Sequence, residues 1–159
     1  MKTSQDIQAL LTNPEIFEIN RLKAHSDHRN YQTLEEAMNK SEMSWRQCLN
    51  GEWLFKYSEN VATRPEGFEA LEADCSDFEK ILVPGHIQLK GYDIPHYVNT
   101  QYAWAGHVEL KPPYIPVQYN PTASYVTYFK VPAEWNGQQV CISFQGVVTD
   151  FNVRCNGEY

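Results

Sequence analysis

Residues 51–57 read Gly-Glu-Trp-Leu-Phe-Lys-Tyr, and their aromatic side chains recur at every second position. Successive side chains of a β-strand point to opposite faces of a sheet, so Trp53, Phe55 and Tyr57 share one face. Apolar residues at a period of two are typical of a strand that buries one face and exposes the other. The stretch therefore predicts a half-buried strand that begins near Gly51.

The same alternation returns in four later runs, with no helical period between them. These runs are 78–83, 125–131, 140–144 and 147–153. Strands that follow one another without intervening helices form antiparallel sheets, and several such strands are typical of two packed sheets. We therefore expect residues 51–159 to form an all-β domain, an antiparallel β-sandwich.

Residues 1–50 are polar and poorly periodic, apart from one local motif. Thr33-Leu34-Glu35-Glu36 has the form of a capping box, in which the Thr side chain accepts from the backbone N–H three residues later. This motif predicts a short helix over 33–39. We expect the rest of 1–50 to be an irregular N-terminal arm.

The last residues contain a strong turn signal, Asn156-Gly157, directly after the predicted strand that ends near 155. A two-residue hairpin turn needs positive φ at both positions, which Asn and Gly tolerate. Only Glu158 and Tyr159 follow, too few for a returning strand. We therefore expect a sandwich that is incomplete at its C-terminus, in a sequence truncated from a longer chain. An unpaired edge there would favour self-association.

Composition and charge argue against several classes of function. The 159 residues carry 13 Lys and Arg against 20 Asp and Glu, a formal net charge of −7, so we expect no nucleic-acid or membrane partner. No apolar run approaches the roughly 18 residues that span a bilayer. The N-terminus has no secretion signal, so we expect a cytoplasmic protein.

The four cysteines are widely spaced, and we expect them to be buried and reduced.

Residues 84–121 are rich in proline, glycine and aromatic residues, and this composition predicts a long loop. Long loops in compact domains are often functional, so we look for a site here. Tyr97, Tyr102 and Trp104 lie in this stretch. Their rings could stack on a sugar, because one face of a pyranose is apolar.

Motifs for catalysis or metal binding are weak. The segment 25–28 holds two histidines and an aspartate, but no helical period places them as ligands, and we expect a solvated or interface segment. The three other histidines stand singly in loops, without a nucleophile motif such as Gly-x-Ser-x-Gly. Glycoside hydrolysis needs two facing carboxyl groups. The acidic pairs Glu35-Glu36 and Glu69 with Glu72 are instead typical of solvated faces.

Several short blocks follow one another in order along residues 13–159. They are Asn13-Pro14-Glu15, Ile19-Asn20-Arg21-Leu22 with Ala24-His25, Leu49-Asn50-Gly51-Glu52-Trp53, Val83-Pro84-Gly85-His86-Ile87-Gln88, Gly91-Tyr92-Asp93-Ile94-Pro95-His96-Tyr97-Val98-Asn99, Pro112-Pro113-Tyr114-Ile115-Pro116, Asn120-Pro121-Thr122, Phe144-Gln145-Gly146-Val147 and Cys155-Asn156-Gly157. Together they resemble the first domain, called the sugar-binding domain, of the β-galactosidases of glycoside hydrolase family 2.

The resemblance implies a galactose-binding-like jelly-roll β-sandwich, preceded by an arm that in some members supports an oligomer interface. In the family both catalytic glutamates, and the Mg and Na sites commonly used, lie in later domains. The resemblance therefore implies no catalytic residue, metal or cofactor in this chain. Asn99 matches the family's asparagine that hydrogen-bonds the galactosyl group, and its amide offers donors and an acceptor. Thr100 is a weaker substrate-binding candidate.

What the resemblance implies is a non-catalytic domain of a cytoplasmic β-galactosidase that hydrolyses terminal β-D-galactosides such as lactose with retention. The chain would be inactive alone and would help to form the galactose pocket and the subunit assembly. Its expected partners are the galactoside, the rest of the enzyme and further copies in a homo-oligomer. Two alternatives stay open: a free-standing carbohydrate-binding module that stacks sugars on the loop aromatics, and a structural complementation segment with no sugar contact.

Overall fold

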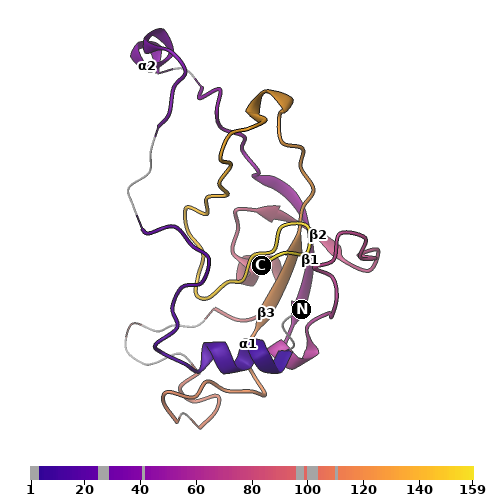
Figure 1. Ribbon diagram of the computed structural model, residues 1–159. Helices are drawn as coiled ribbons and strands as arrows, with labels where there is room; N and C mark the ends of the chain where they lie inside the picture. The colour runs from indigo at the N-terminus through magenta and orange to yellow at the C-terminus, as the bar shows by residue number, and fades with distance from the viewer. Residues whose placement is uncertain (1–3, 25–28, 41, 96–98, 100–103, 110) are drawn as a thin grey trace.

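The computed structural model describes residues 4–24, 29–40, 42–95, 99, 104–109 and 111–159 (Figure 1). The elements in chain order are helices α1 (Ser4–Leu11) and α2 (Leu34–Asn39), strand β1 (Gly51–Ser58), 3₁₀-helix η1 (Val61–Thr63), strand β2 (Glu79–Val83), 3₁₀-helix η2 (Ile87–Lys90), strand β3 (Thr122–Val126) and 3₁₀-helix η3 (Ala133–Trp135). Neither α-helix in this part of the chain is long and apolar enough to cross a membrane.

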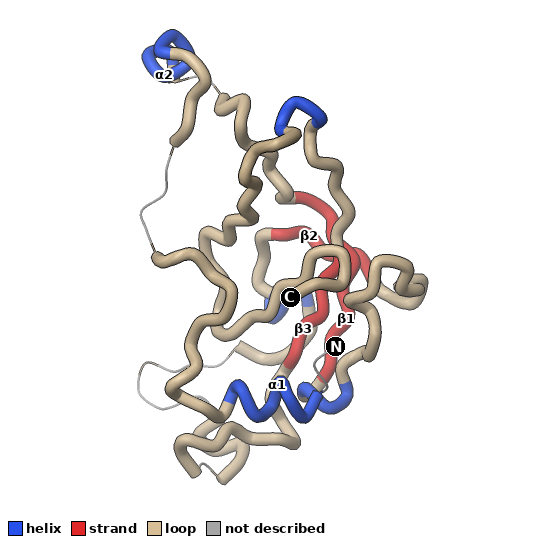
Figure 2. Tube along the Cα trace, viewed as in Figure 1, coloured by secondary structure: helices blue, strands red, loops and turns tan. Residues whose placement is uncertain are grey.

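The three strands form one antiparallel sheet in the order β2-β1-β3, with β1 in the centre (Figure 2). Phe55 of β1 is in register with Glu79 of β2 on one side and with Tyr125 of β3 on the other. The predicted strands at 51–57 and 78–83 are confirmed, and so is the all-β fold class. The described residues hold a single sheet, which is compatible with an incomplete sandwich.

The core lies on the face of β1 that the alternation of aromatic residues predicts. Phe55 is 1% exposed, and its ring centroid lies 4.7 Å from that of Tyr92 and 5.1 Å from that of Tyr125. Trp53 contacts Tyr125 edge to face at 6.5 Å. Aromatic pairs at these separations add to the free energy of burying their surface. Tyr92 follows β2 in sequence, so it attaches the start of the central loop to the sheet.

Helix α2 begins where the capping-box motif predicts. The backbone N–H of Glu36 donates to Thr33 Oγ1 at 3.1 Å, and Thr33 is the N-cap residue. The Glu36 carboxylate accepts from the N–H of Gln32 at 2.8 Å, one residue before the N-cap. The helix ends at Asn39, and the C-cap residue Lys40 has a left-handed conformation with a φ of 50°.

Helix α1 is an element that the sequence analysis missed. It packs against η1, where Val61 is only 4% exposed. A helix of eight residues is marginal in isolation, so this packing is what stabilises it. Its sequence did carry a local signal: Thr3 and Asp6 are spaced as in a capping box, just before the apolar residues of the helix, although the helix itself mixes polar and apolar residues.

The strands predicted at 140–144 and 147–153, and the second half of the one at 125–131, are wrong. All these residues after Val126 run as loop and turn (Figure 2). Their apolar side chains stay partly exposed, from 37% at Val153 to 90% at Val148. A strand is stabilised by ladder hydrogen bonds to a neighbour, and no described segment lies in register beside this one.

The hairpin turn predicted at the end of the sequence is confirmed. Asn156 and Gly157 have φ values of 52° and 86°, as a two-residue hairpin turn requires. Cys155 and Glu158 exchange backbone hydrogen bonds of 2.9 and 3.0 Å. The carbonyl oxygen of Tyr159 accepts from Asn20 Nδ2 at 3.0 Å, so the turn also contacts the arm.

A buried ion pair links the segment after η1 to the end of the chain. Arg64 Nη1 lies 3.1 Å from Glu69 Oε1, and their side chains are 7% and 9% exposed. Arg154 Nε lies 4.0 Å from the same carboxylate oxygen. The expectation that Glu69 is solvated is therefore wrong: two guanidinium groups compensate the charge of the buried carboxylate.

All four cysteines are free thiols. Cys75 is buried as expected, at 8% exposure. Cys48, Cys141 and Cys155 are exposed, so the prediction of burial is wrong for these three. Cys141 and Cys155 lie in the loop and turn after η3, where the predicted strands would have covered them.

Candidate functional site

The candidate substrate-binding residue Asn99 lies in the central segment and is exposed. The other candidate, Thr100, lies outside the described residues, as do Tyr97 and Tyr102. Trp104 is described; it is half-buried, with a φ of 64°, and its carbonyl oxygen accepts from the backbone N–H groups of the turn that follows it. As an exposed residue, Asn99 is accessible to a ligand or to another domain.

The segment that carries Asn99 is flanked by two side chains, those of Asp93 and His107, which both contact Tyr119. The Tyr119 hydroxyl donates to Asp93 Oδ1 at 2.7 Å. The ring of His107 lies against the ring of Tyr119, with centroids 6.1 Å apart and planes inclined by 34°. We call Asp93, His107 and Tyr119 the Tyr119 clasp. It joins residue 93, before Asn99, to residue 107, after it.

The sheet holds Tyr119 in place through both of its sequence neighbours. The backbone N–H of Asn120 donates to the carbonyl oxygen of Glu59 at 2.9 Å. Asn60 Nδ2 donates to the carbonyl oxygen of Gln118 at 3.1 Å. Residues 59 and 60 directly follow β1, and β3 begins at Thr122. The clasp is therefore fixed to the end of the two paired strands.

Electrostatics keep the Tyr119 hydroxyl protonated. Burial raises its pKa to about 12, together with the hydrogen bond to Asp93 and the nearby negative charges of Asp93 and Glu59. The pKa of Tyr57 is raised by the same kinds of effect, burial first and then the charges of Asp93 and Glu59. Because the neutral phenol is favoured, Tyr119 remains a hydrogen-bond donor at all physiological pH values.

A second contact ties the start of the segment to the sheet. The Tyr92 hydroxyl donates to the carboxylate of Glu79, the first residue of β2. This hydrogen bond raises the pKa of Tyr92 above its ordinary value. With its ring on Phe55, Tyr92 fixes the chain one residue before Asp93. Asp93 has a φ of 78°, a left-handed conformation that Asp tolerates better than most residues.

The weaker motifs of the sequence give no competing site in the described residues. The segment 25–28 and His96 lie outside them, so the expectation for those residues stays untested. His86 caps η2 without a side-chain cap hydrogen bond, and His107 belongs to the Tyr119 clasp. Within the described ranges, no three His, Cys, Asp or Glu side chains gather as they would around a metal ion.

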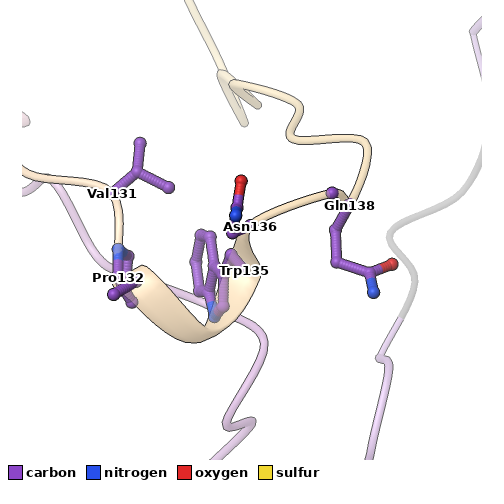
Figure 3. A pocket seen from close by; sticks show the side chains of 7 residues that line it. Val131, Pro132, Trp135, Asn136 and Gln138 are labelled. Atoms are coloured by element: carbon purple, nitrogen blue, oxygen red, sulfur yellow. The ribbon is translucent and has the colours of Figure 1, made fainter.

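A pocket of about 460 Å³ lies elsewhere, around η3 (Figure 3). It is lined by Val131, Pro132, Ala133, Trp135, Asn136, Gly137 and Gln138. These residues come from one short segment and include no charged side chain. Trp135 also contacts Trp45 of the arm, with ring centroids 6.4 Å apart. The pocket does not include Asn99, the residue that the resemblance singles out. A sugar bound in the pocket would therefore not contact Asn99.

Sequence reasoning identified Asn99 but not the Tyr119 clasp, which joins residues on either side of it in the sequence. Asp93 stands in the block that carries the resemblance, while Tyr119 gives no local signal of its own. A hydrogen bond between side chains 26 positions apart in sequence becomes visible only when β3 pairs with β1.

Comparison with known proteins gives a consistent result. The model of the family "Glycosyl hydrolases family 2, sugar binding domain" matches residues 46–159. A β-galactosidase of Halalkalibacterium halodurans is 50% identical over 159 residues, covering all of this chain and 16% of the relative. A β-galactosidase of Clostridium acetobutylicum is 51% identical over 149 residues, 94% of this chain and 17% of the relative. A β-galactosidase large subunit of Latilactobacillus sakei is 41% identical over 161 residues, 94% of this chain and 26% of the relative.

The chain thus spans between about a seventh and a quarter of the length of the curated relatives it matches. The family match takes in the whole sheet, the segment of Asn99 and the Tyr119 clasp. The chain belongs to the sugar-binding domain family of glycosyl hydrolases family 2.

Proposed function

We propose that this chain is the first, non-catalytic domain of a β-galactosidase and that Asn99 contributes to the binding of the galactosyl group. The observation that carries the proposal is the match to relatives named β-galactosidase along the entire chain, at 50% identity for that of Halalkalibacterium halodurans. The exposure of Asn99, on a segment tied at both ends to the fold, supports the same assignment.

The chemistry of an asparagine suits this role. Its amide has two N–H donors and a carbonyl acceptor, so it can pair with two hydroxyl groups of a sugar at once. It cannot supply the acid and the nucleophile that retaining hydrolysis of a β-D-galactoside such as lactose requires. In this proposal those carboxyl groups, and the Mg and Na ions, belong to other domains of the enzyme. Thr100 is proposed as a secondary contact.

The fold and assembly follow from the same proposal. The sheet β2-β1-β3 is then part of a jelly-roll sandwich, and the partly exposed apolar residues after Val126 pack against the remainder of the enzyme. Three relatives are named large subunits, which supports an enzyme of more than one chain. We place this enzyme in the cytoplasm, and residues 1–50 at a subunit contact.

A chimaera tests the proposal. The matching segment of the Halalkalibacterium halodurans β-galactosidase is replaced by this chain, and hydrolysis of a galactoside is followed. Asn99→Ala is expected to lower kcat/KM by about 5- to 150-fold, the equivalent of about 1 to 3 kcal/mol for hydroxyl groups left without a partner. Asn39→Ala is the matched control, because Asn39 is an exposed asparagine at the end of α2. Equal kcat/KM values for the two variants would refute the role of Asn99.

The alternative of a free-standing sugar-binding module has one observation in its favour, the pocket at η3. Trp135 offers an aromatic surface there, beside the amides of Asn136 and Gln138 (Figure 3). This alternative predicts that Asn136→Ala, and not Asn99→Ala, weakens binding of a sugar to the chain alone.

A further inference from the structure

We propose that Tyr119 is a positioning residue for Asn99, because the Tyr119 clasp fixes both ends of the segment from which Asn99 projects. This inference rests on the proposed function of Asn99 and adds a residue that acts through it. Tyr119 itself would not contact the sugar. Its role would be to limit the positions that the Asn99 amide can adopt before substrate arrives.

The first step of the argument is the geometry of the two ends. Asp93 lies six residues before Asn99 and His107 lies eight residues after it. The Tyr119 hydroxyl holds the first end through a hydrogen bond of 2.7 Å, and the Tyr119 ring lies against the second end at 6.1 Å. Tyr119 thus joins two described positions that flank Asn99, and closing a loop between two positions costs the chain conformational freedom.

The second step is that the clasp is anchored to the sheet. The two sequence neighbours of Tyr119 bond to the residues that directly follow β1. The carbonyl oxygen of Gln118 accepts from Asn60, and the backbone N–H of Asn120 donates to Glu59. A shift of Tyr119 would therefore disturb the hydrogen bonds that its two neighbours make with residues 59 and 60. Binding groups carried on segments fixed to rigid elements lose less entropy when a ligand orders them, so the clasp favours a preorganised Asn99.

The third step is that the Tyr119 hydroxyl keeps the proton that this hydrogen bond needs at neutral pH. Asp93 is the acceptor, and the neutral Tyr119 phenol is the donor. Since the pKa of Tyr119 is raised to about 12, the donor keeps its proton well above neutral pH. The hydroxyl of Tyr119 can therefore donate to Asp93 at neutral pH.

The test is a double-mutant cycle in the chimaera, with kcat and KM measured separately. Tyr119→Phe keeps the ring and removes the hydroxyl donor. We expect it to raise KM, and so lower kcat/KM, by about 3- to 10-fold, with kcat nearly unchanged, because one hydrogen bond that limits Asn99 is lost. In the Asn99→Ala background the same substitution is expected to change kcat/KM by less than about twofold, since the group that it positions is gone.

The second partner of the hydrogen bond supplies a rescue experiment. Asp93→Asn keeps an acceptor oxygen and tolerates positive φ, whereas Asp93→Ala loses the acceptor and is strained at a φ of 78°. Asp93→Asn should therefore retain most of the activity that Asp93→Ala loses. Tyr128→Phe is the matched control, because Tyr128 is 67% exposed and lies outside the clasp. Thermal unfolding of each variant separates a positioning effect from a loss of fold.

The outcomes distinguish this inference from the proposed function. If Asn99→Ala lowers kcat/KM and Tyr119→Phe does not, the inference is wrong and the role of Asn99 stands. If Tyr119→Phe lowers kcat/KM by the same factor with and without Asn99, its effect is merely structural and the inference is again overturned. If Asn99→Ala has no effect, the proposed function itself fails.

Discussion

Substitution of Glu69 by Gln should destabilise the fold strongly. The Glu69 carboxylate lies 3.1 Å from Arg64 Nη1 and 4.0 Å from Arg154 Nε, with all three side chains between 7% and 12% exposed. At an effective dielectric constant of about 20, the shorter pair alone attracts with about 5 kcal/mol before desolvation is subtracted. Removing one partner of such a buried pair costs about 3 to 5 kcal/mol, because an uncompensated charge stays buried.

We expect the lower value, about 3 kcal/mol, because the Gln side-chain oxygen still accepts a hydrogen bond. With a urea dependence of about 2 kcal/mol per molar, the unfolding midpoint would fall by about 1.5 M. Urea unfolding followed by tryptophan fluorescence measures this shift. Glu66→Gln is the matched control, since Glu66 is exposed in the same segment. A midpoint for Glu69→Gln equal to that of Glu66→Gln would refute the argument that this ion pair links residues 64–69 to the end of the chain.

Three further predictions follow from individual contacts. Cys75 should react with a thiol reagent much more slowly than the three exposed cysteines, because burial and the charges of Asp74 and Asp77 raise the pKa of its thiol; a single fast phase for all four thiols would contradict this. The raised pKa of Tyr119 means that its neutral form stabilises the fold fully below about pH 10 and that this contribution is lost as pH rises towards about 12. The pKa values of Tyr57, Tyr92 and Tyr125 are raised as well, so Tyr119→Phe should reduce the late part of the tyrosinate absorbance by one tyrosine, and an unchanged late part would contradict this. Gly157→Ala should destabilise the chain by about 1 kcal/mol in urea unfolding, since Gly157 has a φ of 86°, and an unchanged midpoint would mean that the turn is not needed for stability.

The parts of the fold that the sequence predicted depend on local chemistry. The alternation of Trp53, Phe55 and Tyr57 sets the buried face of β1, and Thr33 caps its helix through a neighbouring N–H. The positive φ values of Asn156 and Gly157 follow from the residue types themselves. Each of these features is determined within a few residues, so a short pattern was enough.

The parts that the sequence did not predict depend on distant partners. The residues at 140–144 and 147–153 alternate like strands, yet their ladder hydrogen bonds would have to come from another segment. The Glu69 carboxylate is buried only because Arg64 and Arg154 converge on it. In the candidate site the same distinction holds. The resemblance singled out Asn99, whereas the role of Tyr119 emerges from the pairing of β1 with β3.

The central claim is that this chain carries only part of a galactoside site, which the rest of a β-galactosidase completes. The most direct measurement is a titration of the chain alone with galactose, following the side-chain amide signal of Asn99 by NMR. A single asparagine should not hold a sugar, so we predict no saturation up to about 10 mM, which corresponds to binding weaker than about 3 kcal/mol. Saturation of the Asn99 signal at micromolar galactose would contradict the claim, because the chain would then hold a complete sugar site of its own.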